Sequence, residues 1–292
     1  MNLIFDFGGV LIDWDPHHLY DPYFGGRARA DWFLQNICTM EWNTQMDGGK
    51  PFAEGIAELS ARFPEWSQEI AMFHSQWTKM VGGPIPGMLD LVRELKAAGH
   101  RLYGLSNWSA ETFPLICHDY PVLKLLDGMV ISGFESAGRV EGCGDGIAAE
   151  GTAGSGAGSG AGGAADEPAD GFAARSGAGG AAGSTADGHA DDFAARSGAR
   201  GAAGGTADGH ADGFAARSGA GARMSGRAPL IKPDPEIYKL LLSRYSLQPA
   251  DCIFIDDNPA NVAAAQTLGI HAITFTNCPN LRKQLAELQL LK

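Results

Sequence analysis

Several signals are missing from this 292-residue sequence, and each absence excludes a class of protein. No apolar run approaches the roughly 18 residues that a membrane-spanning helix needs. The apolar start of the chain is interrupted by Asp6 and lacks the basic flank and small-residue cleavage site of a signal peptide. We therefore expect a cytoplasmic protein with no part in a membrane.

Cysteine and basic residues are also scarce. The five cysteines are widely spaced without a CxxC pair, so the sequence indicates neither a disulfide framework nor a zinc site, and we expect reduced, packed thiols. The formal net charge of -12 disfavours nucleic acid or an anionic membrane as a partner, because such surfaces attract basic patches. We expect a small-molecule partner, and the sequence leaves the oligomeric state unknown.

Glycine, by contrast, is abundant: the chain has 41, about twice the roughly 7% of an average domain. Glycine and alanine dominate residues 137–226, where the motif FAARSGA recurs from Phe172, Phe193 and Phe214. Each repeat holds one large apolar side chain, which is too little burial to offset ordering its residues at about 1 to 2 kcal/mol each. We expect a disordered insert rather than a stacked solenoid. The sequence leaves open whether this insert gates a site, binds a partner or has no role.

The rest of the chain alternates short apolar strands with amphipathic helices, which is typical of an α/β protein. Strands are expected at 3–5, 101–105, 129–131, 252–255 and 272–275. Helices are expected at 86–98, 110–117, 235–245, 259–268 and 280–291. Residues 16–83 show no strand signal and three aromatic-rich helical patterns, at 31–40, 52–63 and 65–79.

This pattern predicts a Rossmann-like open parallel sheet with a small helical cap inserted after the first strand. The predicted core is 1–13, 85–136 and 227–292; the cap is 14–84; the insert is 137–226. Ligands bind beyond the carboxyl ends of strands in such sheets, so polar residues at those ends are the candidate site.

Asp6 follows the first strand and precedes Gly8 and Gly9, which let the backbone turn sharply beside a ligand. It is a candidate nucleophile, although capping a turn would explain it equally well. Ser106 and Asn107 follow the second strand and suit phosphate binding at a helix start, or ordinary N-capping.

Lys232 lies between apolar residues and two prolines that stiffen its segment. It could supply positive charge to phosphoryl oxygens, or be a surface charge. Asp256 and Asp257 end a buried strand, where two adjacent carboxylates repel unless a cation lies beside them. Mg²⁺ is the expected cation, with N-capping by the pair as the alternative.

The order DxG, SN, KPDPEIY and DDNPANV resembles the haloacid dehalogenase-like hydrolases, over the whole non-repeat chain. The segments FDFGGVL, LSNWS and FIDDNPANVAAAQTLGI are similar to sugar phosphatases of the glucose-1-phosphate phosphatase kind. The resemblance implies a Mg²⁺-dependent phosphatase of a small phosphate monoester, with Asp6 as covalent nucleophile.

The same resemblance implies the roles of the other residues. Asp6, the Gly8 carbonyl and Asp257 would hold Mg²⁺, with Asp256 ligating directly or through water. Ser106, Asn107 and Lys232 would bind the transferring phosphoryl group, with Lys232 also catalytic.

The sequence departs from the family pattern at Gly8, where most phosphatases of the superfamily carry a second aspartate as general acid. Asp13 and Asp15 are candidate substitutes, with hinge contacts as the alternative. Two rival functions remain: a 2-haloacid dehalogenase, which the acidic pair disfavours, and a weakly active or non-catalytic protein whose insert binds a partner.

Overall fold

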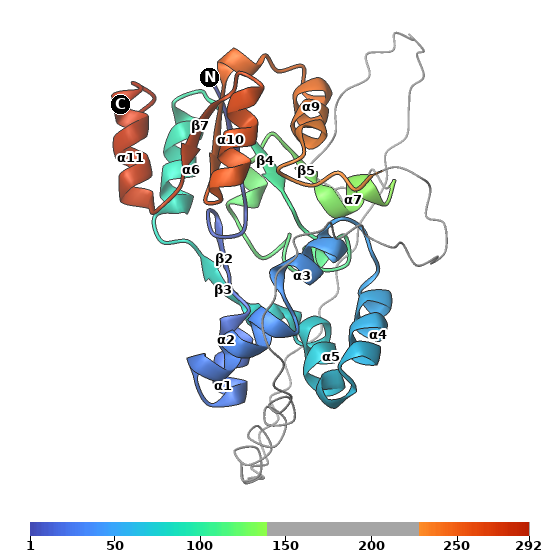
Figure 1. Cartoon of the computed structure of the whole chain (residues 1–292). Helices are drawn as coiled ribbons and strands as arrows, with labels where there is room; N and C mark the ends of the chain where they lie inside the picture. The colour runs from blue at the N-terminus through green and yellow to red at the C-terminus, as the bar shows by residue number, and fades with distance from the viewer. Residues whose placement is uncertain (139–227, 292) are drawn as a thin grey trace, which may run out of the picture. The chain divides into compact units, whose positions relative to one another are not determined.

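The five expected apolar strands form one parallel sheet in the computed structural model, which describes residues 1–138 and 228–291 (Figure 1). The strand order is β5-β4-β1-β6-β7. The bounds are β1 (Asn2–Phe5), β4 (Arg101–Ser106), β5 (Gly128–Ile131), β6 (Cys252–Asp256) and β7 (His271–Thr274). The first strand is central, so its end lies beside the ends of β4 and β6. The predicted α/β class and parallel sheet are confirmed.

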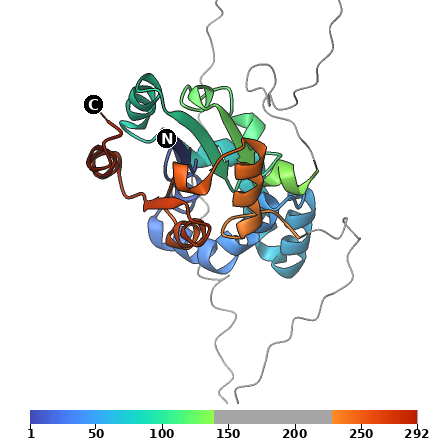
Figure 2. The same ribbon diagram turned by 90° about the horizontal axis from the view of Figure 1, so that it is seen from above.

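Helices cover both faces of this sheet (Figure 2). On one face lie α9 (Pro235–Arg244) and α10 (Pro259–Thr267), whose apolar side chains join those of β4 and β6 in one core cluster. On the other face, α6 (Met88–Ala97) contacts α11 (Cys278–Glu287). Strands buried on both sides read as unbroken apolar runs, which is why the sequence revealed them.

A second, two-stranded antiparallel sheet carries the helical segment. It consists of β2 (Ile12–Trp14) and β3 (Val81–Pro84). Between them run α1 (His17–Phe24), α2 (Arg27–Asn36), α3 (Met40–Asp47), α4 (Phe52–Arg62) and α5 (Ser67–Ser75). β3 was not recognisable from the sequence, because its residues, Val-Gly-Gly-Pro, include three that are depleted in strands. The chain therefore makes a short second strand before it enters the helical segment. The predicted limits of the cap, 14–84, stay a prediction.

Two helix predictions were wrong. The expected helix at 110–117 is only a short 3₁₀ helix, Phe113–Leu115, because Pro114 lacks the N–H that a helix interior requires. The helix α3 was not predicted at all, since the pattern assigned to 31–40 ends at Asn36 and a new helix starts at Met40. Thr39 caps this new helix by accepting a hydrogen bond from the Trp42 N–H at 3.2 Å.

The predicted insert falls almost wholly outside the described residues, so its expected disorder stays a prediction. The two flanks of that segment meet, because the Leu230 N–H donates to Ser136 Oγ at 3.0 Å. Cys38, Cys252 and Cys278 are free and buried, whereas Cys117 is disulfide-bonded, contrary to the expectation of reduced thiols. Among the described residues, no helix is both long and apolar enough to cross a membrane.

Candidate active site

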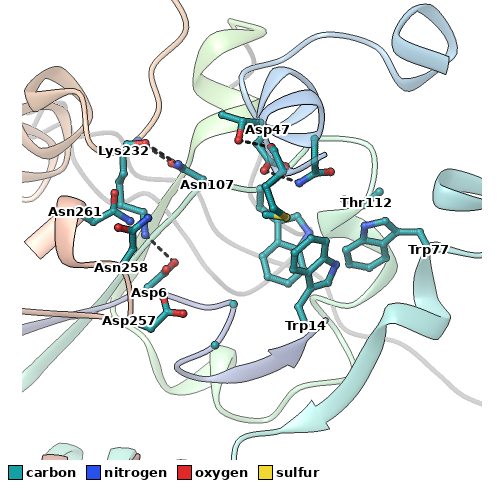
Figure 3. A pocket seen from close by; sticks show the side chains of 16 residues that line it. Asp6, Trp14, Asp47, Trp77, Asn107, Thr112, Lys232, Asp257, Asn258 and Asn261 are labelled. Atoms are coloured by element: carbon teal, nitrogen blue, oxygen red, sulfur yellow. Dashed lines mark hydrogen bonds and ion pairs between the residues drawn. The ribbon is translucent and has the colours of Figure 1, made fainter. Parts of the chain in front are cut away.

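The polar strand ends meet at a cavity of about 330 Å³ (Figure 3). Asp6 follows β1, Asn107 follows β4, and Asp257 follows β6, so the parallel topology brings them to one edge of the sheet. The core residues that line the cavity are Asp6, Gly8, Gly9, Trp14, Asn107, Trp108, Thr112, Lys232, Asp257, Asn258 and Asn261. The segment between β2 and β3 adds Met40, Asn43, Thr44, Asp47 and Trp77.

Lys232 is the electrostatic centre of this site. Its ammonium group lies 2.8 Å from Asp6 Oδ1 and 2.7 Å from Asp256 Oδ2, and the residue is only 3% exposed. Burial lowers the pKa of Lys232, but the two carboxylates outweigh it and the net pKa is raised. The side chain is therefore a fixed positive charge, and the reading of Lys232 as a surface lysine is wrong.

Asn107 holds the backbone of Lys232 in place. Asn107 Nδ2 donates to the Lys232 carbonyl at 2.9 Å, and the Lys232 N–H donates to Asn107 Oδ1 at 2.8 Å. Both polar atoms of this amide thus serve to position the lysine, while the residue also borders the cavity. Ser106, the last residue of β4, is 1% exposed and is not among the residues that line the cavity. The predicted contacts of Ser106 and Asn107 with phosphate stay predictions.

Asp6 is buried at the base of the cavity with one carboxylate oxygen occupied. Oδ1 accepts from the Phe7 N–H at 2.7 Å and faces the Lys232 ammonium. Burial raises the pKa of Asp6 to about 7, against the lowering effect of Lys232. These interactions of Oδ1 fix the carboxylate, so that Oδ2 is the oxygen oriented toward attack on a ligand.

The two adjacent aspartates after β6 have different surroundings. Asp256 is fully buried, and its oxygens accept from Lys232, from the Asn258 N–H at 2.8 Å and from the Asn261 amide at 3.0 and 3.1 Å. Asp257 lines the cavity, and partial burial together with Asp256 raises its pKa. Asp256 therefore anchors Lys232, whereas Asp257 faces the ligand space.

Asp6, Asp256 and Asp257 can each offer an oxygen within 4.8 Å of the others. Within residues 1–138 and 228–291 this is the one such group of acidic, histidine or cysteine side chains. A Cβ on Gly9 would lie 2.5 Å from Asp257 Oδ2, so glycine is needed there for the carboxylate to stand close to the chain. Oxygen donors of this kind fit a hard divalent cation such as Mg²⁺.

The departure from the family pattern at Gly8 leaves open space. A Cβ built on Gly8 would meet no heavy atom within 4 Å. Asp13 and Asp15 do not fill the gap, because neither lines the cavity. Asp13 instead pairs with His18 Nε2 at 3.0 Å, and Asp15 accepts from the His17 N–H at 2.9 Å. Both make local contacts where the helical segment leaves β2.

The unpredicted helix α3 presents one face to the cavity. Met40, Asn43, Thr44 and Asp47 all border it, and this spacing places them on one side of a helix. On the other side, Trp42 and Met46 are buried in the helical segment. Asp47 is a functional candidate that the sequence did not point to. Its position on the same helix face as Met40, Asn43 and Thr44 can be recognised only when a helix is known to start at Met40.

Three tryptophans, Trp14, Trp77 and Trp108, form an aromatic wall of the cavity. The rings of Trp77 and Trp108 pack edge to face at 5.6 Å. The ring N–H groups of Trp14 and Trp108 find no acceptor among the described residues. This part of the cavity is thus lined by flat aromatic surfaces, and the two unpaired ring N–H groups are buried.

Comparison with known proteins relates the chain to one family of hydrolases. Residues 193–269 match the family model described as haloacid dehalogenase-like hydrolase. A solved structure described as a predicted HAD-like family hydrolase from Porphyromonas gingivalis has a similar fold, with a TM-score of 0.52 and 15% identity. That similarity covers 99% of this chain and 97% of the other.

Two curated relatives match over shorter segments. Flavin mononucleotide hydrolase 1 of Arabidopsis thaliana is 44% identical over 57 residues, which are 20% of this chain and 23% of the relative. Acyl-CoA dehydrogenase family member 10 of Mus musculus is 44% identical over 59 residues, 20% of this chain and 6% of the relative. The chain therefore spans less than a quarter of the length of either relative.

Proposed function

Because this chain belongs to the haloacid dehalogenase-like hydrolase superfamily, we propose that it is a Mg²⁺-dependent phosphatase acting on a small phosphate monoester. The observation that carries the proposal is the buried Lys232 ammonium held between Asp6 and Asp256 at the edge of the cavity. A fixed positive charge beside an oriented carboxylate suits attack on an anionic phosphoryl group.

In the proposed reaction, Asp6 attacks phosphorus in line and displaces the alcohol, giving an aspartyl-phosphate that water hydrolyses. Lys232 neutralises charge on the phosphoryl oxygens, and Asn107 keeps it in position. Asp6, the Gly8 carbonyl and Asp257 are the groups that would hold Mg²⁺, which when bound adds positive charge at those same oxygens. Asp256 acts through Lys232, and its place as a further ligand stays a prediction.

The cavity walls favour a sugar phosphate as the substrate. Trp14, Trp77 and Trp108 offer flat faces for the apolar side of a sugar ring. Asn43 and Thr44 add further polar groups to the lining of the cavity. A small-molecule ester in the cytoplasm, rather than nucleic acid or a membrane, is the proposed partner.

Release of inorganic phosphate from a panel of sugar phosphates and p-nitrophenyl phosphate, with Mg²⁺ or with EDTA, tests this function. We expect Mg²⁺-dependent release that is lost in Asp6→Asn, because an amide is a poor nucleophile. Asp90→Asn, an exposed aspartate on α6 that pairs with Arg93, is the matched control and should retain activity. Activity that survives Asp6→Asn, or that needs no divalent cation, would contradict the proposal.

The same preparations separate the rival functions. A dehalogenase would release halide from a 2-haloacid without a metal, through the same Asp6 carboxylate. A non-catalytic protein would release neither phosphate nor halide. Asp257 and the well-anchored Asp256 favour phosphoryl transfer, since a carbon substrate gives no reason to gather three carboxylates.

A further inference from the structure

An in-line displacement sets a geometric condition on the missing general acid. The leaving oxygen lies on the far side of phosphorus from the attacking Asp6 oxygen. A group that protonates it must therefore stand across the cavity from Asp6. With glycine at position 8, the described residues next to the nucleophile supply no such group.

Among the described residues that line the cavity, Asp47 is the remaining carboxyl candidate for that position. In the described part of the chain, the carboxyl side chains that line the cavity are Asp6, Asp257 and Asp47. Asp6 and Asp257 belong to the same acidic cluster. Figure 3 shows Asp47 beside α3, apart from both of them.

Contacts from both parts of the molecule fix Asp47. Within α3, the Asn43 amide donates to Asp47 Oδ2 at 3.1 Å. From the core, the Ser132 hydroxyl donates to the Asp47 carbonyl at 2.7 Å, and the backbone of Ser109 hydrogen-bonds its carboxyl group. The side chain is thus held over the site by the core as well as by its own helix.

The surroundings of Asp47 also favour its protonated form. Burial raises the pKa of Asp47 to about 8, the hydrogen bond from Ser109 lowers it, and the charge of Asp6 raises it against that of Lys232. Its position in the last turn of α3, near the negative end of the helix dipole, acts in the same direction. The described groups that hydrogen-bond it, Asn43, Ser109 and Ser132, carry no charge. The protonated form of the carboxyl group is therefore favoured near neutral pH.

We propose that Asp47 is the general acid and base of the phosphatase reaction, supplied by α3 in place of the aspartate absent at position 8; this rests on the proposed function. As the Asp6 oxygen bonds to phosphorus and the bond to the leaving oxygen breaks, Asp47 gives its proton to that oxygen and the alcohol departs neutral. Asp47, now a carboxylate, takes a proton from water, whose oxygen attacks the aspartyl-phosphate. The bond between phosphorus and Asp6 breaks, and inorganic phosphate leaves.

The dependence of kcat/KM on the leaving group tests the proposal, because protonation by a general acid accelerates the reaction only when the alcohol is a poor leaving group. For Asp47→Asn we expect kcat/KM with phenyl phosphate to fall about 10²-fold or more, and with p-nitrophenyl phosphate far less. Glu41→Gln, an exposed carboxyl on the same helix outside the cavity lining, is the matched control and should change neither rate. An equal loss on both esters would reduce Asp47 to a structural role and overturn the proposal.

The pH profile gives a second readout that a structural role would not move. Because the active form of Asp47 is protonated, wild-type kcat/KM for phenyl phosphate should decline as pH rises through about 8. Asp47→Asn should lose this alkaline limb. Retention of the same limb in the variant would assign it to another group and refute the proposal.

Replacement at position 8 offers a rescue. Gly8 has free space at its Cβ and lies outside the left-handed region, so Gly8→Asp fits, whereas Gly9 has φ +73° and no room. In the Asp47→Asn background, Gly8→Asp should restore phenyl phosphate turnover, and Gly8→Asn should not. If wild type cleaves neither ester, the phosphatase function itself fails; if it cleaves both and Asp47→Asn behaves like wild type, only the role of Asp47 fails.

Discussion

At the scale of single residues, Lys232 is the side chain on which the site depends for charge balance. It is the cation that both Asp6 and Asp256 contact directly, and all three are buried. Removing one member of such a buried set leaves uncompensated charge in a poorly solvated place. Stability and charge neutralisation in the site therefore rest on the same two ion pairs.

Lys232→Met keeps the apolar stem and removes the charge, so it tests this point. We expect a loss of about 3 to 5 kcal/mol in the free energy of unfolding, since two carboxylates lose their partner. Urea unfolding in EDTA measures it. Lys239→Met removes the exposed pair with Glu236 and should cost about 1 kcal/mol or less. Equal, small losses in the two variants would show that Asp6 and Asp256 do not need the lysine.

Individual site residues were largely readable from the sequence, because Asp6, Asn107 and Asp257 each follow an apolar strand and Lys232 lies in a proline-stiffened segment. Asp6, Asn107, Lys232 and Asp257 do meet at one cavity, as the parallel sheet requires. The sequence could not show which of these residues contact one another. Asn107 bonds the backbone of Lys232 and Asp256 bonds its ammonium group, across more than twenty residues in each case.

At the scale of elements, α3 is the part of the helical segment that shapes the cavity. Its inward face carries Met40 and Asp47, and its outward face is tied to α4 by the Trp42 ring N–H, which donates to the Gly55 carbonyl at 3.2 Å. The helix is only two turns long, too short to be stable alone, so its ends and tertiary contacts decide its position.

Substitution of the N-cap residue of α3 measures how far the position of this helix depends on its end, without changing a residue that lines the cavity. Thr39→Ala removes the side-chain acceptor for the Trp42 N–H and should cost about 1 kcal/mol of stability. Because Met40 and Asp47 would then be held less firmly, we expect a higher KM for the best sugar phosphate. Thr39→Ser keeps the acceptor and should behave like wild type. A normal KM in Thr39→Ala, despite lost stability, would mean that the core contacts of Asp47 suffice.

Elements were predicted correctly where burial on two faces leaves an unbroken apolar run. Prediction failed where a proline or a cap residue interrupts a pattern that otherwise reads as a helix. The sheet strands belong to the first kind. The expected helix at 110–117 belongs to the second, because Pro114 interrupts an otherwise helical pattern. The start of α3 was obscured because its cap, Thr39, falls inside a region that reads as one continuous helix. Asp47 was missed for that reason alone.

At the scale of the whole molecule, the undescribed segment joins two places that already touch. Gly138 ends the described chain on one side and Ala228 resumes it on the other, and Leu230 bonds Ser136 across that break. Lys232 follows directly. The contacts that position the lysine, from Asn107, Asp6 and Asp256, all come from residues outside the segment.

Deletion of residues 152–213 follows as the test at this scale. It removes a stretch that lies outside the unit formed by Met1–Gly151 and Phe214–Lys292. The connecting loop becomes roughly threefold shorter, and since each halving lowers the closure cost by about 0.6 kcal/mol, we expect stability to rise by about 1 kcal/mol. Urea unfolding measures this, and kcat/KM for p-nitrophenyl phosphate should stay unchanged because the site contacts of the described residues all come from outside the deleted stretch. A fall in activity with stability intact would instead assign the repeats a part in gating the cavity or in binding a partner.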